Sequence, residues 1–203
     1  METREKIIAT AKLLFLGYGV KSVTMDELAR EAGVSKKTIY QTFKDKDELV
    51  FETFTQALSN DACHLETLEN DTDGVIEQLI AISRFIRERF SNMHPMLLNE
   101  IKRYYPKCYV EFENFKKEYA WKSIVDLLDK GKELGYFRPE INSEIIAQLR
   151  IEEFSMMFDP TRFNPSKFNI VESQLQIFEH FVYGVLTDKG KKIYEEKISH
   201  QSE

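Results

Sequence analysis

The chain has 203 residues, of which 42% are hydrophobic and 12% aromatic, and its formal net charge is −6. This hydrophobic content supports a folded core, so the composition excludes a wholly disordered chain. The two cysteines, Cys63 and Cys108, show no CxxC spacing and indicate reduced thiols in a cytosolic protein rather than a disulfide framework. No signal peptide is visible, and no apolar stretch approaches the roughly 20 residues that span a bilayer, so we expect a cytoplasmic protein with no membrane partner.

Charge is distributed unevenly along the chain. Residues 1–46 hold nine Lys and Arg against six Asp and Glu, a net charge of +3, so the remaining 157 residues carry −9. A basic segment on an acidic body indicates that only this segment meets a polyanion. Chance variation in surface charge would produce the same split, so charge alone does not decide between the two readings.

Apolar residues at helical spacing open the chain. They predict an amphipathic helix over residues 7–15, which ends at Gly17 or Gly19, one of them in a left-handed cap conformation. Thr24 is expected to cap a short second helix, with Glu27 as its capping-box partner three residues later. A glycine turn follows this helix, as the close approach and sharp turn of a helix-turn-helix motif require.

A third short helix is expected after this turn, with Ser35 as its cap. Ile39 and Phe43 lie four residues apart, so both are expected on one side of the helix, facing inward. The opposite face is cationic, hydrogen-bonding and aromatic and holds Lys36, Lys37, Tyr40, Gln41 and Lys44, flanked by Thr38 and Thr42. Lysine and tyrosine suit phosphate oxygens and glutamine can pair with adenine in the major groove, so this face predicts DNA binding. The alternative is a solvated surface helix, because isolated matches to this motif are common.

The rest of the chain shows helical periodicity and no strand-like alternation. Apolar faces predict helices over residues 45–68, 75–90, 95–106, 107–133, 143–158 and 170–186. The charged segment that starts at Gly190 is expected to be a solvated helix or a frayed tail. The predicted fold class is therefore all-α, with about nine helices and no internal repeat.

The stretch SVTMDELAREAGVSKKTIYQTFKDKDELV, residues 22–50, resembles the DNA-binding signature of the TetR family of bacterial transcriptional regulators. The matched positions are Phe15, Gly19, Thr24, Leu28, Ala29, Ala32, Gly33, Val34, Ser35, Thr38, Ile39, Tyr40, Phe43, Lys46 and Leu49. The resemblance covers about a quarter of the chain. It implies a three-helix DNA-binding domain over residues 1–46 and a larger helical ligand-binding and dimerisation domain over residues 47–203. It also implies a homodimeric repressor that binds a palindromic double-stranded DNA operator and is released by a small-molecule effector.

The resemblance assigns roles to individual residues of the DNA-binding domain. Thr24 and Lys46 would bind phosphates, Tyr40 would contact the backbone, and Lys36, Thr38, Gln41 and Thr42 would face the major groove. Lys37 stands where many relatives have Gly or Pro, and it would add a phosphate contact. Lys44, on the same face of the third helix, is also expected to contact DNA. Gln41 and Thr42 replace the common His and Tyr or His, which puts the base preference in doubt but not DNA binding.

Under this resemblance the central helices enclose a ligand pocket. The candidate lining residues are Phe85, Arg89, Met93, Leu97, Ile101, Tyr104, Phe112, Phe115, Tyr119, Trp121 and Phe154. Each is also a candidate for ordinary core packing, because large apolar side chains are mostly buried for packing alone. As a group they are compatible with an apolar or aromatic ligand.

The last two strongly apolar helices are the best candidates for a dimer interface. Paired across a twofold axis they would form a four-helix bundle, as the resemblance also implies. The candidate interface residues are Ile146, Leu149, Met157, Leu175, Phe178, Val182 and Val185. The alternative is that these apolar stripes pack within their own subunit.

Other chemistries have weak support. His64, His94 and His180 lack metal-ligand spacing, so no metal is expected. No cofactor-binding or catalytic motif occurs, which predicts that the protein is not an enzyme. Two other functions stay open: a DNA-binding regulator without a small-molecule ligand, and a helical adaptor or enzyme with a vestigial helix-turn-helix.

Overall fold

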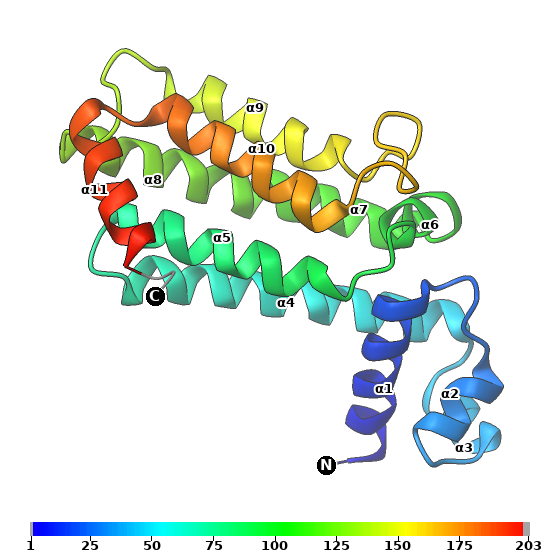
Figure 1. The fold of residues 1–203 in the computed structure, drawn as a ribbon. Coiled ribbons are helices and arrows are strands. Elements are labelled where there is room, and N and C mark those ends of the chain that lie inside the picture. The colour runs from blue at the N-terminus through cyan, green and yellow to red at the C-terminus, as the bar shows by residue number, and fades with distance from the viewer. Residues whose placement is uncertain (1, 201–203) are drawn as a thin grey trace. The chain divides into compact units, whose positions relative to one another are not determined.

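The computed structural model describes residues 2–200, and these fold into helices (Figure 1). They form α1 (Thr3–Tyr18), α2 (Met25–Glu31), α3 (Lys36–Thr42), α4 (Lys46–Asp71), α5 (Val75–Ser91), α6 (Leu97–Tyr104), α7 (Pro106–Asn114), the π-helical segment η1 (Phe115–Ala120), α8 (Trp121–Glu133), α9 (Ser143–Met156), α10 (Ile170–Val185) and α11 (Asp188–Ser199). No strand occurs between residues 2 and 200, where an isolated bridge joins Phe137 and Leu186. The all-α prediction is confirmed. None of the described helices is long and apolar enough to cross a membrane.

Two segments explain why the described chain has more helices than the sequence suggested. The helix expected over residues 107–133 is interrupted, because η1 separates α7 from α8 and buries Lys116. The segment after Val185, expected as a helix or a frayed tail, forms α11. Thr187 caps this helix by accepting a hydrogen bond from the Gly190 N–H at 3.1 Å, and Tyr194 is buried.

The described chain divides into two compact units. The first comprises the described residues up to Asp61 together with Asn92–Phe115, and the second comprises Ala62–Ser91 and the described residues from Lys116 onward. Both α4 and the α7–η1–α8 run therefore contribute residues to each unit. The grouping of residues 92–115 with the N-terminal helices brings α6 and α7 into the unit that holds the helix-turn-helix.

The first unit has a small apolar core beneath α1, α2 and α3. Its fully buried members include Ile7, Ala11, Leu28, Ile39 and Leu49, each 0% exposed. The α1 members Ile7, Ala11 and Phe15 recur at helical spacing, so α1 buries one stripe, as its sequence predicted.

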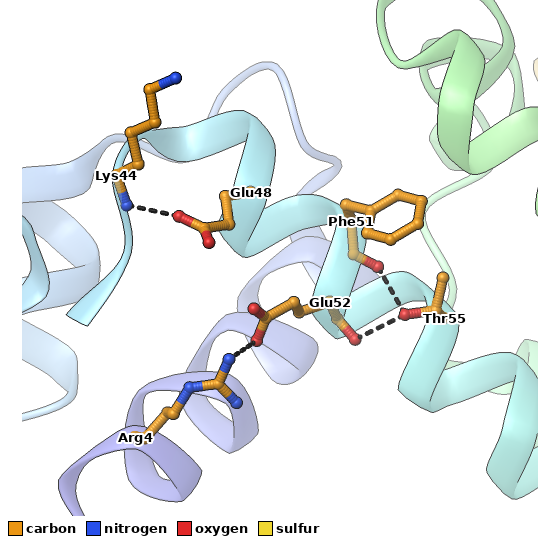
Figure 2. A network of polar contacts seen from close by, with 6 residues as sticks. All are labelled: Arg4, Lys44, Glu48, Phe51, Glu52 and Thr55. Atoms are coloured by element: carbon orange, nitrogen blue, oxygen red, sulfur yellow. Dashed lines mark hydrogen bonds and ion pairs between the residues drawn. The ribbon is translucent and has the colours of Figure 1, made fainter.

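An ion pair joins the start of α1 to α4 in the first unit (Figure 2). The Arg4 guanidinium group pairs with the Glu52 carboxylate. The central carbon of this guanidinium group lies 5.2 Å from the ring centroid of Phe43, which follows α3. The Lys44 backbone N–H donates to Glu48 Oε2 at 2.5 Å, while the Lys44 side chain points away from this network. These contacts connect three helices and leave the Lys44 ammonium group on the outside.

The second unit is a layered helical body in which α5 packs along α10, α8 along α9, and α11 on α5 (Figure 1). Val75, Leu79, Leu128, Ala147 and Val182 are each 0% exposed and form its core. One glycine is required here: a Cβ at Gly131 on α8 would lie 2.0 Å from the ring of the fully buried Phe137.

Candidate nucleic-acid interface

The helix-turn-helix begins at Thr24, which caps α2 as expected. Its Oγ1 accepts a hydrogen bond from the Glu27 N–H at 3.2 Å, and its own N–H donates to Glu27 Oε2 at 2.8 Å. The hydrogen bond from the Thr24 backbone is the main reason that the pKa of Glu27 is lowered from its ordinary value. The predicted capping box is therefore confirmed, and it sets the first turn of α2.

The turn between α2 and α3 depends on Gly33 and Ser35. Gly33 has a φ of +61°, which favours glycine, and the following Val34 N–H donates to the Ala29 carbonyl at 3.0 Å. Ser35 Oγ then accepts from the Thr38 N–H at 3.0 Å, which confirms Ser35 as the cap of α3. The glycine turn and the serine cap together set the orientation of α3 relative to α2.

The two faces of α3 are as different as the sequence predicted. Ile39 is 0% exposed and Phe43 is 1% exposed, so both anchor the helix in the core of the first unit. The exposed residues of the other face are Lys36, Lys37, Tyr40, Gln41 and Lys44, with Thr38 and Thr42 half-buried beside them. This face offers positive charge and hydrogen-bonding groups to solvent, the combination that phosphates and base edges bind.

Asp26 adds a carboxylate beside this face, and the sequence argument missed it. Its Oδ2 lies 2.9 Å from Lys36 Nζ, and this hydrogen bond raises the pKa of Lys36. Both side chains are largely exposed. The sequence of α3 itself places no carboxylate on this face, whereas Asp26 comes from the first turn of α2.

Lys46 also has an unexpected environment. Its ammonium group donates to the Val20 carbonyl at 2.6 Å and to the Val23 carbonyl, both in the loop between α1 and α2. Burial lowers the pKa of this half-buried lysine. An ammonium group has three N–H donors, so one is left for the predicted phosphate contact, which stays a prediction.

The same loop is held from α6. The Lys21 N–H donates to Glu100 Oε2 on α6 at 2.9 Å. Just before α6, the His94 N–H donates to the carbonyl of Leu16 in the last turn of α1 at 2.6 Å. Gly19 has a φ of +79°, and a Cβ there would lie 2.8 Å from Glu100 Oε2. Because Glu100 is 79 residues from Lys21, local sequence patterns gave no signal for this contact.

The residues predicted to line a ligand pocket divide between the two units. In the first unit the buried ones are Met93, Leu97, Ile101 and Phe112. Phe115 is half-buried there, and Tyr104 is 44% exposed, with the Lys21 ammonium 5.6 Å from its ring centroid. Tyr104 therefore lies on the surface of its unit and the other members pack as core.

The second unit holds the remaining ligand candidates, all half-buried: Phe85, Arg89, Tyr119, Trp121 and Phe154. The Phe85 ring stacks on His64 with centroids 4.8 Å apart, and the Tyr119 hydroxyl donates to the Ala62 carbonyl at 2.8 Å. Phe154 packs against other aromatic rings of the same unit. Their role in ligand binding stays a prediction.

The predicted dimer residues separate into interior and surface positions. Those buried in their own subunit are Met157, Phe178, Val182 and Val185, and those half-buried are Ile146 and Leu175. Leu149 on α9 is 53% exposed, and Ile145, one turn before it on the same helix, is 66% exposed. The exposed apolar side chains of α9 therefore lie on one side of this helix, and their role in a dimer stays a prediction.

Known proteins resemble this chain both in its N-terminal helices and over most of its length. The family model described as "Bacterial regulatory proteins, tetR family" matches residues 7–53. YvaF of Bacillus subtilis (strain 168), named an uncharacterized HTH-type transcriptional regulator, is 25% identical over 169 residues, covering 83% of this chain and 88% of YvaF. The HTH-type transcriptional repressor KstR2 of Mycobacterium tuberculosis (strain ATCC 25618 / H37Rv) is 24% identical over 149 residues, covering 70% of this chain and 73% of KstR2.

Solved structures share the fold over nearly the whole chain. Reduced NemR from E. coli superposes with a TM-score of 0.70 at 17% identity, covering 92% of this chain and 98% of that one. A TetR-family regulator from Agrobacterium tumefaciens superposes with a TM-score of 0.72 at 14% identity, covering 91% of this chain and 98% of that one. The capped helix-turn-helix and the cationic α3 face thus lie in the segment that matches the tetR family of bacterial regulatory proteins, and the longer chain is similar to HTH-type transcriptional regulators.

Proposed function

We propose that the protein is a homodimeric repressor that binds a palindromic operator and is released from it by a small apolar or aromatic ligand. The observation that carries the proposal is the exposed cationic face of α3 on a capped helix-turn-helix. Relatives named KstR2 are transcriptional repressors by name, which supports repression rather than activation. Binding to DNA also makes the cytoplasm the expected location.

The proposed DNA contacts follow the exposure of the α3 face. Lys36, Thr38, Gln41 and Thr42 are assigned to the major groove, and Thr24, Lys37, Tyr40, Lys44 and Lys46 to the sugar-phosphate backbone. Exposure supports Lys37 and Gln41 most directly, because neither side chain is buried. Thr42 Oγ1 donates to the Thr38 carbonyl at 2.9 Å, which leaves its methyl group for contact with a thymine methyl.

The proposed domains are a DNA-binding domain of residues 1–46 and a ligand-binding and dimerisation domain of residues 47–203. One α3 helix reads only a few base pairs, so two copies are needed for half-sites about 34–36 Å apart. The exposed Leu149 and Ile145 on α9 support a dimer through this helix, because large apolar side chains on one helix face typically mark an interface.

Fluorescence anisotropy with the DNA upstream of the protein's own gene tests DNA recognition. We expect specific binding that weakens as salt concentration rises, because phosphate contacts release counterions. A scrambled duplex of the same length and composition is the control. Equal affinity for both duplexes, or binding without salt dependence, would contradict the proposal.

Lys37→Gln tests the backbone contacts. Each lost phosphate contact changes the slope of log K against log salt by about 0.9, so a dimer loses about 1.8 from its slope. Binding should weaken similarly on specific and scrambled DNA, since a phosphate contact carries no sequence information. Lys192→Gln, on the exposed side of α11, is the matched control and should leave the slope unchanged.

Release by ligand needs a coupling free energy of only about 1–3 kcal/mol for a 5–150-fold change in operator affinity. In the first unit, Glu100 on α6 and Lys46 on α4 both hold the loop that leads into α2. A ligand that shifts either helix would move this loop and tilt the helix-turn-helix. A regulator without a ligand would instead keep the same operator affinity with every compound tested.

A further inference from the structure

Arg150 is a charged side chain in the interior of the second unit. It lies on α9 with its side chain 7% exposed. Its guanidinium carbon is 5.4 Å from the ring centroid of Phe178 and 6.0 Å from that of Phe181, both on α10. Burial lowers the pKa of Arg150 to about 10, so the group is still charged at neutral pH.

This buried charge is incompletely paired. Within the described residues, Arg150 Nη1 has no hydrogen-bond partner. It lies 3.9 Å from Glu153 Oε2, which is too far for a hydrogen bond. Two phenylalanine faces offset only part of the lost hydration. Because an apolar residue of similar volume usually leaves a fold equally or more stable, packing does not explain an arginine here.

Gln174 on α10 supplies a second unsatisfied group nearby. It is 0% exposed, its Nε2 donates to the Phe154 carbonyl at 3.3 Å, and its Oε1 has no partner among residues 2–200. Phe154 follows Arg150 by one helical turn on α9, and Phe178, which packs on Arg150, follows Gln174 by one turn on α10. A free donor and a free acceptor therefore lie about one turn apart between the two helices.

Aromatic rings pack close to this pair. The ring centroid of Phe154 is 5.8 Å from that of Phe90 and 5.2 Å from that of Phe158. A groove of about 610 Å³ runs between α5 and α10, with polar and charged side chains over most of its lining and an apolar strip formed by Val171, Leu175 and Phe178. Phe178 lies against the guanidinium group and also lines the groove, so the apolar strip of the groove ends next to Arg150.

We propose that Arg150 and Gln174 form the headgroup site for a carboxylate ligand with an apolar tail. The carboxylate pairs with Arg150 Nη1, and a hydroxyl group beside it donates to Gln174 Oε1. The tail lies along the groove between α5 and α10. The ligand class is therefore a hydroxylated carboxylic acid with an aliphatic chain, and a single negative charge suits a site that also contains Glu153.

This assignment rests on the proposed function, because it names the chemical class of the effector, but its binding test needs no DNA. The probes are 3-hydroxydecanoate, decanoate and 1-decanol, each below the concentration at which it aggregates. Binding is measured by thermal unfolding and by the fluorescence of Trp121, the single tryptophan of the chain. We expect 3-hydroxydecanoate to bind more tightly than decanoate, and both acids at least tenfold more tightly than the alcohol.

Arg150→Met removes the charge and keeps an apolar side chain of similar length. We expect its ligand-free melting temperature to stay the same or rise, and its affinity for both acids to fall at least tenfold. Arg162→Met makes the same substitution at an exposed arginine that pairs with Asp159, and it should bind like the wild type. Arg150→Lys keeps a positive charge and should keep the preference for acid over alcohol, although with lower affinity.

Several outcomes would overturn the assignment. They are no binding of either acid to the wild type, equal binding of acids and alcohol, or full acid affinity in a folded Arg150→Met protein. Because the comparison of acid with alcohol uses the wild type, it holds even if a variant does not fold. Gln174→Leu should bind 3-hydroxydecanoate no more tightly than decanoate and should keep the wild-type affinity for decanoate. If this variant still prefers 3-hydroxydecanoate as strongly as the wild type does, Gln174 does not contact the ligand.

Operator release is measured separately on the same samples. If the acids bind through Arg150 and operator affinity stays constant, the headgroup site stands and the proposed release by ligand fails. If the acids do not bind and the operator is still recognised, the headgroup site fails and DNA binding stands.

Discussion

At the scale of single residues, the lysines near the helix-turn-helix differ in how readily their ammonium groups can contact DNA. The Lys36–Asp26 pair is exposed, and exposed ion pairs contribute little to stability, so Lys36 can leave Asp26 for a base or phosphate. Lys46 is half-buried and bonded to two loop carbonyls. We therefore infer that Lys46 positions the loop before α2 whether or not it also touches DNA.

Lys46→Met tests this positioning role. Two carbonyls of the α1–α2 loop would lose their donor, so we expect the free energy of unfolding in urea to fall by about 1–3 kcal/mol. Operator affinity should fall as well, with an unchanged salt slope if positioning is the whole role. A slope reduced by about 0.9 per subunit would show that Lys46 also binds a phosphate.

Lys44→Met is the control for stability, because the Lys44 side chain is exposed. Its free energy of unfolding should stay within about 0.5 kcal/mol of the wild type. Equal stability of the Lys46→Met and Lys44→Met proteins would contradict the positioning role.

At the scale of elements, short capped helices present the DNA-binding face. Both α2 and α3 have only seven residues, and helices this short are marginal in isolation. Their stability comes from the caps at Thr24 and Ser35 and from burial of Leu28 and Ile39. The orientation of α3, and with it the proposed operator binding, therefore depends on caps as well as on packing.

Thr24→Ala removes the α2 cap and should lower the free energy of unfolding by about 1 kcal/mol. The measurement is urea-induced unfolding followed by circular dichroism. Thr24→Ser keeps the hydroxyl group that accepts from the Glu27 N–H, so it should retain most of the stability. If serine and alanine are equally destabilising, the lost methyl group rather than the lost cap accounts for the effect.

At the scale of the whole molecule, the proposed function depends on assembly of two copies. The body is acidic and the N-terminal segment basic, so electrostatics favours contact with DNA only through the helix-turn-helix. The exposed apolar side chains of α9 provide the surface on which a second copy is expected to pack. Twofold pairing would then present two α3 faces to a palindrome.

Leu149→Lys places a charge at the centre of this expected interface. We expect sedimentation velocity to show a shift from dimer toward monomer and operator affinity to fall at least tenfold, because each half-site then binds alone. Leu134→Lys, at another exposed leucine, should remain dimeric. A Leu149→Lys protein that remains dimeric would place the interface elsewhere.

Local patterns were sufficient for the helices and for the division of α3 into an inner and an outer face. Periodicity of apolar residues predicts which side of a helix is buried, and the caps at Thr24 and Ser35 depend on groups three residues away. Such interactions are short in sequence, so they can be read from it. The π-helical η1 was missed because it keeps a helical pattern while changing the number of residues in one turn.

The sequence by itself determined the all-α class, the helix-turn-helix and the side chains that face outward from α3, because each depends on residues within one or two turns. Only the tertiary structure decided that Asp26 meets Lys36, that Glu100 holds the loop before α2 and that Arg150 is buried against Phe178. These contacts join segments separated by 10 to 79 residues. Their formation depends on how helices pack, and no local period encodes that packing.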